Sequence, residues 1–416
     1  MVKRVLMIAY HYPPLRGGSG IQRTLAFTQY LPQSDWQPLV LSVSANAYVD
    51  KDPVNNIPQN GIHRSFALDA SRHLAIRGRY PSWLAQPDRW VSWWLTAVPA
   101  GLRMIRRYKP DVIWSSYPIA TAHLIAMTLH RLTGIPWIAD QRDPMVDTDY
   151  PPDQRRRRIH AWIEQQAIQR SAMVVCTTPG AVDDLVKRFP QVNDGKIQLI
   201  ENGYDEARFA TATIGAALPT SAGAPFRLLH SGVIYPSERD PSQLFSALAS
   251  LLAEGDISPA SFRLVLRASG HDEYLLRLLL RYPGVEQLIE LAPSLPYPAA
   301  LAEMLGADGL LLLQASNCNG QIPAKLYEYL RAQRPLIALT DPNGDTAGAL
   351  RSAGINTIGR LDSATDIATT LMRFLQLCRD RQAPLAPASV IASHSRAART
   401  RTLAALLDRV YLKEQS

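Results

Sequence analysis

Cysteine is scarce in this sequence. Cys176, Cys318 and Cys378 are far apart among 416 residues and have no metal-ligand spacing. This excludes a disulfide scaffold and a zinc ribbon, and it suits a reducing cytosol. Long apolar runs are also missing, so we expect no transmembrane helix. The first apolar run, residues 2–10, is too short to span a bilayer and lacks a small-residue cleavage site, which favours a strand over a signal peptide.

Acidic residues are in deficit, but only in one half of the chain. The formal net charge is +8. Residues 1–200 hold 24 Lys and Arg against 15 Asp and Glu, whereas the remainder holds 20 against 21. This asymmetry favours an anionic partner for the N-terminal half, such as phospholipid, a phosphorylated substrate or nucleic acid, although a solvated surface explains it equally well. No RNA- or DNA-binding module motif is present, so we expect no nucleic-acid partner.

Strand-like apolar runs alternate with helical patterns along the first 200 residues, which predicts βαβ units and a parallel sheet. Residues 210–225 are small, uncharged and rich in Gly and Pro, as linkers are, and the alternation restarts after them. The predicted class is α/β, with two doubly wound Rossmann-like domains facing across a cleft. We expect a first domain over 1–205, a linker over 206–225, a second domain over 226–390 and a final helix over 391–416.

The first loop, residues 10–23, leaves the first predicted strand and opens a helix. Gly17 and Gly18 let the backbone approach a ligand, and the helix N-terminus offers free N–H groups to an anion. The spacing fits neither G-x-G-x-x-G nor a P-loop, so a nicotinamide or P-loop site is only weakly indicated. A plain strand-to-helix turn explains the loop as well.

Asp140, Arg142 and Asp143 follow another predicted strand, so they belong at the carboxyl edge of the sheet. Two carboxylates and a guanidinium there could orient a hydroxyl and shift one another's pKa. A buried Asp–Arg pair that ties loops together is a comparable alternative. The nearby D-x-D sequence at 147–149 lies in a polar loop between prolines, so we interpret it as solvated and expect no obligatory metal.

Two segments of the C-terminal half could hold a nucleotide. Gly232 and Arg239 follow a predicted strand, where a backbone N–H and a bidentate guanidinium could bind phosphate. Lys325 and Glu328 lie three residues apart near the start of a predicted helix. They form either an ordinary surface pair, or a site in which Lys325 meets phosphate and Glu328 accepts two ribose hydroxyls.

Five segments together resemble the retaining family 4 glycosyltransferases of the GT-B fold, over nearly the whole chain. These are Gly17-Gly18 with Arg23, D-x-R-D at Asp140–Asp143, I-x-N-G-x-D-x-x-x-F at Ile200–Phe209, the Gly232…Arg239 loop, and I-P-A-K-L-Y-E-Y-L from Ile322. The resemblance implies a nucleotide-sugar donor, with a UDP-sugar favoured. It also implies that the second domain holds the donor, that the first holds the acceptor, and that transfer retains the anomeric configuration.

The resemblance also implies roles for single residues. Glu328 binds the donor ribose, Arg239 or Lys325 binds the diphosphate, and Gly17 and Gly18 approach the phosphates. Asp143, or Asp140, orients the acceptor hydroxyl beside Arg142. Two positions depart from the family pattern: Gly320 replaces the first Glu of E-x7-E, and Val233 replaces the usual Arg after the phosphate-loop glycine.

Aromatic and basic residues crowd one stretch of the N-terminal half. The residues are Trp83, Trp90, Trp93 and Trp94, followed by Arg103, Arg106, Arg107 and Lys109, with a further run at Arg155–Arg158. Such a stretch suits a membrane interface, but tryptophans at helical spacing are more often core. We therefore hypothesise a cytoplasmic enzyme, peripheral on the inner face of the membrane, that acts on a lipid-linked or polysaccharide-precursor acceptor. The alternatives are a transferase with a soluble acceptor and a non-catalytic protein that binds nucleotide or nucleic acid.

Overall fold

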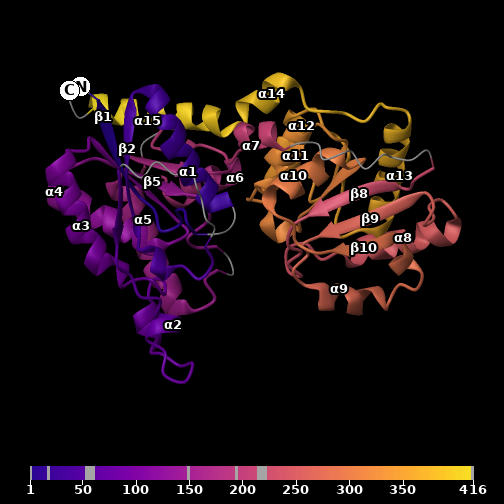
Figure 1. Cartoon of the computed structure of the whole chain (residues 1–416), viewed down its shortest axis with the longest axis horizontal. Helices are drawn as coiled ribbons and strands as arrows, with labels where there is room; N and C mark the ends of the chain where they lie inside the picture. Colours follow the sequence, from indigo (N-terminus) through magenta and orange to yellow (C-terminus); the bar gives the residue numbers. More distant parts are fainter. Residues whose placement is uncertain are drawn as a thin grey trace. The chain divides into compact units, whose positions relative to one another are not determined.

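The computed structural model describes residues 2–15, 19–51, 61–147, 150–192, 195–212 and 223–413. The chain divides into two compact units, each with its own parallel sheet and core (Figure 1). Unit 1 comprises Met1–Asn202 and Arg396–Ser416, and unit 2 comprises Gly203–Ser395. Among the described helices, none is long and apolar enough to cross a bilayer.

The sheet of unit 1 has seven parallel strands in the order β3-β2-β1-β4-β5-β6-β7. Helices cover both of its faces, so successive side chains of a strand are all buried: in β1, Val5 and Met7 pack on one face and Leu6 and Ile8 on the other. The strands are β1 (Lys3–Ile8), β2 (Trp36–Val43), β3 (Ile62–Ser65), β4 (Val112–Ser116), β5 (Trp137–Gln141), β6 (Met173–Cys176) and β7 (Ile197–Leu199).

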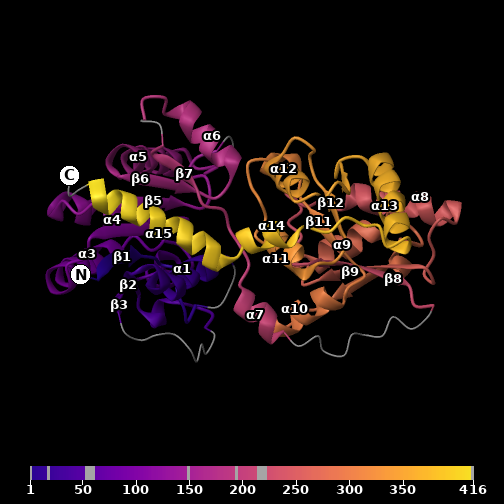
Figure 2. The same ribbon diagram turned by 90° about the horizontal axis from the view of Figure 1, so that it is seen from above.

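The helices of unit 1 include one from the far end of the chain. Helix α15 lies along α1 (Figure 2) and buries Leu403, Leu407 and Val410 in the same cluster as Phe27. Arg399 of α15 also pairs with Glu201, just after β7. The helices are α1 (Ser19–Tyr30), α2 (Ala70–His73), α3 (Trp93–Tyr108), α4 (Ala120–Thr133), α5 (Gln154–Arg170), α6 (Pro179–Arg188) and α15 (Arg396–Lys413).

The sheet of unit 2 has six parallel strands in the order β10-β9-β8-β11-β12-β13. The order reverses between β8 and β11, and ligands of doubly wound sheets bind at the carboxyl ends of the strands at such a point. The strands are β8 (Phe226–Ser231), β9 (Phe262–Arg267), β10 (Ile289–Ala292), β11 (Gly309–Leu313), β12 (Leu336–Leu339) and β13 (Ile358–Gly359).

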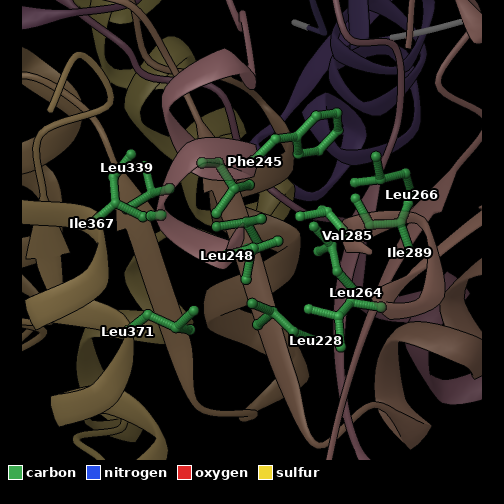
Figure 3. Close-up of a cluster of buried hydrophobic side chains, with 14 of the residues drawn as sticks. Leu228, Phe245, Leu248, Leu264, Leu266, Val285, Ile289, Leu339, Ile367 and Leu371 are labelled. Carbon is green, nitrogen blue, oxygen red and sulfur yellow. The ribbon is translucent and has the colours of Figure 1, made fainter. Parts of the chain in front are cut away.

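Two apolar clusters fill the two sides of this sheet. On one side Leu228, Leu264 and Leu339 of the strands meet Phe245 and Leu371 of α8 and α13 (Figure 3). The helices of unit 2 are α7 (Glu206–Thr211), α8 (Ser242–Glu254), α9 (Asp272–Leu279), α10 (Tyr297–Gly306), α11 (Lys325–Ala332), α12 (Asp345–Ser352), α13 (Ala364–Arg379) and α14 (Ala388–Ser393).

The predicted α/β class with two Rossmann-like sheets is confirmed, and the element boundaries refine the predicted segments. The start of the predicted linker is helix α7, whose Phe209 is buried in unit 2 and whose Glu206 pairs with Arg331. Residues 213–222 of that linker lie outside the described part of the chain. Helix α14 belongs to unit 2 and α15 to unit 1, which resumes at Arg396.

Two of the tryptophans in the stretch assigned to a membrane interface, Trp93 and Trp94, pack inside unit 1 instead. Trp93 is fully buried and its indole N–H donates to Ser65 Oγ at 2.9 Å. Trp94 is partly buried and donates to Thr128 Oγ1 at 3.0 Å. These residues begin helix α3, where Trp93 belongs to an apolar cluster of unit 1 and Trp94 packs against that cluster. In this stretch Trp83 is the large exposed indole, at 70%.

Candidate functional site

The loop from β8 to α8 is held in one conformation by backbone hydrogen bonds. The Gly232 N–H donates to Arg267 O at 2.8 Å, and the Ile234 N–H donates to Ser269 O at 2.9 Å. Further along, the Ala315 N–H donates to Glu238 O at 2.7 Å, so the loop is tied to the segment after β11. The two strand ends at which the sheet order reverses are therefore linked by this loop.

Gly232 gives the loop a shape that other residues rarely adopt. Its φ is +125°, and a Cβ at this position would lie 2.7 Å from Lys325 Nζ. Glycine is therefore needed both for the backbone conformation and for the close approach of the ammonium group. The ammonium itself donates to Ser231 O at 2.8 Å.

Lys325 is the sole lysine between residues 203 and 395. Burial lowers its pKa to about 7, and the nearby Arg239 guanidinium acts in the same direction, against a weaker opposite effect of Glu328. The protonated form of Lys325 therefore has too little negative charge nearby to stabilise it fully. An anion bound beside it would stabilise the protonated form and relieve the repulsion from Arg239.

Arg239 on this loop is a second cation close to Lys325 of α11 (Lys325–Ala332). It lies in a helical turn in which its own N–H donates to Tyr235 O at 2.8 Å, and its Nη1 donates to Val233 O at 2.6 Å. The guanidinium thus lies beside Val233. The Arg239 side chain is partly exposed, and its charge lowers the pKa of Lys325. The two cations are therefore close enough to contact the same anion.

Helix α11 places Lys325 and Glu328 on its accessible side. Leu326, Tyr327, Tyr329 and Leu330 are buried against the sheet, which leaves positions 325 and 328 together one turn apart. The Tyr297 hydroxyl donates to Glu328 Oε1 at 2.7 Å and orients the carboxylate. The structure therefore brings together four of the predicted donor-binding residues, Gly232, Arg239, Lys325 and Glu328.

Sequence reasoning missed Tyr297 and Tyr329 as supports of this region. The buried Tyr329 hydroxyl accepts the Ser231 N–H at 3.0 Å, so α11 holds the end of β8 directly. The adjacency of Tyr329 to Glu328 was a signal in the sequence, because a helix that presents residue 328 outward turns residue 329 toward the sheet. Tyr297 gave no such signal, since it is 31 residues from Glu328 in the sequence.

In unit 1, Asp140 forms a buried ion pair with Arg23. It is fully buried and accepts from Arg23 Nε at 3.1 Å and from Arg23 Nη2 at 2.8 Å. Arg23 also donates to Glu201 O at 3.0 Å, which ties α1 to the segment after β7. The structure shows the buried pair that the sequence offered as an alternative, because both carboxylate oxygens of Asp140 accept from Arg23 inside the protein. A role of Asp140 in orienting an acceptor hydroxyl stays a prediction.

Arg142 and Asp143 lie in a more accessible place, at the carboxyl ends of β1, β4 and β5. Arg142 Nε donates to Tyr117 O at 2.6 Å, and the guanidinium packs so closely on Gly20 that a Cβ there would lie 2.3 Å from it. Asp143 is exposed to solvent. His11 joins this group, because burial and Arg142 together lower its pKa to about 4 and keep the imidazole neutral near pH 7.

Some predicted features fall outside the described residues. Gly17 and Gly18 are among them, as are two residues of the D-x-D sequence, Thr148 and Asp149. Among the residues that the structure does describe, no group of three or more His, Cys, Asp or Glu side chains is placed to hold a metal ion.

The N-terminal half of the chain is similar to a known family. Residues 18–203 match the family described as Glycosyl transferase 4-like domain. The alpha-maltose-1-phosphate synthase of Mycolicibacterium smegmatis is 23% identical over 152 residues, covering 33% of this chain. The match spans 36%, about a third, of that relative's length.

Solved structures cover nearly the whole chain at low identity. The sucrose-phosphate synthase (tll1590) of Thermosynechococcus elongatus has a TM-score of 0.63 at 14% identity, over 99% of this chain and 97% of that one. Anabaena Alr3699/HepE, solved in complex with UDP-glucose, has a TM-score of 0.59 at 14% identity, over 99% and 97%. The chain therefore has the GT-B fold, with two Rossmann-like sheets, and matches the glycosyl transferase 4-like domain over residues 18–203.

Proposed function

We propose that this protein is a glycosyltransferase of the retaining family 4 type that uses a nucleoside diphosphate sugar, with a UDP-sugar favoured. The observation that carries the proposal is the pair of cations, Lys325 and Arg239, around the Gly232 backbone, with Glu328 one helical turn away. This is the chemistry of a nucleoside diphosphate: two negative phosphates beside a ribose diol. The complex of Anabaena Alr3699/HepE with UDP-glucose supports the choice of nucleotide.

In this proposal each group meets one part of the donor. Lys325 and Arg239 bind the diphosphate, and they stabilise the charge that develops on it as the glycosidic bond breaks. Glu328 accepts hydrogen bonds from the ribose hydroxyls, because one carboxylate can accept from both members of a vicinal diol. Gly232 lets the backbone approach the phosphates without a side chain in between.

The transfer step itself is proposed to retain the anomeric configuration. The bond from the sugar C1 to the diphosphate oxygen breaks, and its electron pair stays with the phosphate. The acceptor hydroxyl oxygen bonds to C1 on the same face, and its proton passes to the leaving phosphate. Unit 1 holds the acceptor, where the exposed Asp143 orients the hydroxyl and Arg142 lies beside it.

We propose a lipid-linked or polysaccharide-precursor acceptor, at the inner face of the cytoplasmic membrane. The support is the charge of the N-terminal half, which holds 24 basic against 15 acidic residues in its first 200 positions. A positive field attracts an acceptor that carries a diphosphate. The proposal needs no metal ion, because Lys325 and Arg239 supply the positive charge.

Thermal unfolding with UDP, GDP, ADP and CMP tests the proposal. A ligand at about 100 times its Kd adds roughly 2.7 kcal/mol to the stability of the part that binds it. We expect UDP to stabilise the protein and Lys325→Met to remove the effect. The matched control is Arg373→Met, an exposed cation on α13 in the same unit, which should leave the effect intact. Absence of a shift with every nucleotide at millimolar concentration would overturn the proposal.

A further inference from the structure

Unit 1 carries a projecting arm, residues 70–87, between β3 and α3. It begins with the short helix α2, makes a hairpin turn and ends in a 3₁₀ turn, Ser82–Ala85 (Figure 1, around and below the label α2). At the hairpin, Ile76 and Arg79 exchange two backbone hydrogen bonds of 2.8 and 3.0 Å. Arg77 and Gly78 between them both have positive φ, as a two-residue type I′ turn requires, so the tip has a defined shape.

The base of the arm is fixed to the body of unit 1 at both ends. Asp69 caps α2 by accepting the Ser71 N–H at 2.9 Å and pairs with Arg89 at 3.3 Å. Asp88 is buried and accepts the Thr121 N–H at 2.8 Å, at the start of α4. The two acidic residues that flank the arm are therefore occupied inside the fold, and they do not compensate charge at its tip.

The arm carries exposed apolar and basic side chains. Ile76 is 80% exposed at the hairpin, and Trp83 is 70% exposed in the 3₁₀ turn that ends the arm. Arg77 and Arg79 are exposed between them, and Arg72 lies nearby. No Asp or Glu occurs from residue 70 to residue 87.

We infer that this arm docks on an anionic lipid surface. An indole and an aliphatic side chain suit the boundary between headgroups and acyl chains, and each arginine near an anionic bilayer strengthens binding by about fivefold at moderate salt. The charge of the arm is complementary to such a surface, since it carries three arginines and no carboxylate. The inference goes beyond the proposed transfer reaction and does not depend on the nucleotide site.

Vesicle flotation of the full chain tests it, with pure phosphatidylcholine vesicles and with vesicles that contain about one third phosphatidylglycerol. We expect binding to the anionic vesicles alone, weakened by high salt. The double variant Arg77→Ala with Arg79→Ala should bind about 25-fold more weakly, from two fivefold losses. The double variant Ile76→Ser with Trp83→Ser should bind more weakly by about tenfold or more.

Helix α5 offers a matched control in the same unit, because Trp162 is 48% exposed and Arg155 and Arg158 are exposed beside it. Trp162→Ser and the double variant Arg155→Ala with Arg158→Ala should bind anionic vesicles as the unmodified protein does. The inference is overturned if the protein does not bind anionic vesicles, or if the α5 variants lose as much binding as the arm variants. It is also overturned if Ile76→Ser dissolves a concentration-dependent dimer, because a second copy then covers the tip.

Discussion

Lys325 should behave as an amine whose protonation depends on the ligand. Burial and Arg239 lower its pKa to about 7, so in the free protein it loses its charge as the pH rises through 7. A diphosphate favours the charged form and raises the pKa, so binding takes up a proton between pH 7 and the higher pKa of the complex. UDP affinity should therefore fall as the pH rises above 7.

Calorimetry at pH 7.5 in two buffers of different ionisation enthalpy measures this proton uptake. We expect uptake of up to one proton with the unmodified protein and a clearly smaller uptake with Lys325→Met. Because Lys325 is the sole lysine of unit 2, amine acylation offers a second measurement, in which UDP should slow the modification of this one residue. Equal uptake in both proteins would contradict the assignment of Lys325 to the diphosphate.

Substitution of Asp140 should lower the stability of the protein, whereas substitution of Asp143 should lower its activity. Asp140→Asn leaves the buried Arg23 guanidinium without its anion, and loss of one partner of a buried pair costs about 3–5 kcal/mol in the free energy of unfolding. Asp143→Asn changes an exposed side chain, so its effect on stability should stay within about 0.5 kcal/mol. Denaturant unfolding measures both, and a transfer assay should show a loss with Asp143→Asn at unchanged stability.

At the scale of the element, the loop after β8 requires a glycine at position 232, whereas the segment before α11 has room for a side chain at position 320. Gly232 has a φ of +125° and faces Lys325 Nζ, whereas a Cβ at Gly320 would meet no atom within 4 Å. Gly232→Ala forces strain of about 1–3 kcal/mol and displaces the ammonium, so UDP should bind about tenfold more weakly. Gly320→Ala is the matched control and should leave UDP affinity unchanged in the same titration.

The first apolar run, residues 2–10, predicted β1 within about two residues at each end, because burial on both faces of the sheet leaves a clear pattern. Strands β3 and β13 were missed, because they have four and two residues and carry little apolar signal. The sequence left Trp93 open between a membrane face and a core helix, since a periodic Trp and Arg stretch fits either, and the structure buries this side chain. The 325/328 spacing predicted one helical face correctly, because that geometry is local.

The site of unit 1 was harder to predict for a different reason. Asp140 and Asp143 are separated by two residues, yet one is fully buried and the other is exposed. Which of them turns inward depends on Arg23, 117 residues away in the sequence, and no local pattern records that partner. His11 is a further example, because its lowered pKa depends partly on Arg142, which is far from it in the sequence.

At the scale of the whole molecule, the C-terminal helix stabilises the unit that contains the N-terminus. Leu407 is fully buried in the core of unit 1, whereas Leu412 on the same helix is 63% exposed. Leu407→Ala should cost about 2–5 kcal/mol in unit 1, and Leu412→Ala should cost little. Hydrogen exchange should show faster exchange in β1 and α1 for Leu407→Ala. Faster exchange confined to unit 2 would contradict the assignment of α15 to unit 1.

UDP should instead slow hydrogen exchange in unit 2. UDP at saturation is expected to slow hydrogen exchange in the loop after β8 and in α11, because Gly232, Arg239, Lys325 and Glu328 come from these two segments. The exchange in β1 and α1 provides the internal reference for each sample. Each ligand or variant thus has a unit in which its effect should appear.

The most direct test of the central claim is a titration with UDP and with 2′,3′-dideoxy-UDP, each against the unmodified protein and Glu328→Ala. If Glu328 binds the ribose diol, loss of the diol should weaken binding to the unmodified protein by about 1.5–3 kcal/mol, the range for hydrogen bonds to a charged group. The same loss should have little effect on Glu328→Ala, which gives a coupling free energy of similar size. An equal loss of affinity in both proteins would contradict the claim that unit 2 holds the nucleotide at Glu328.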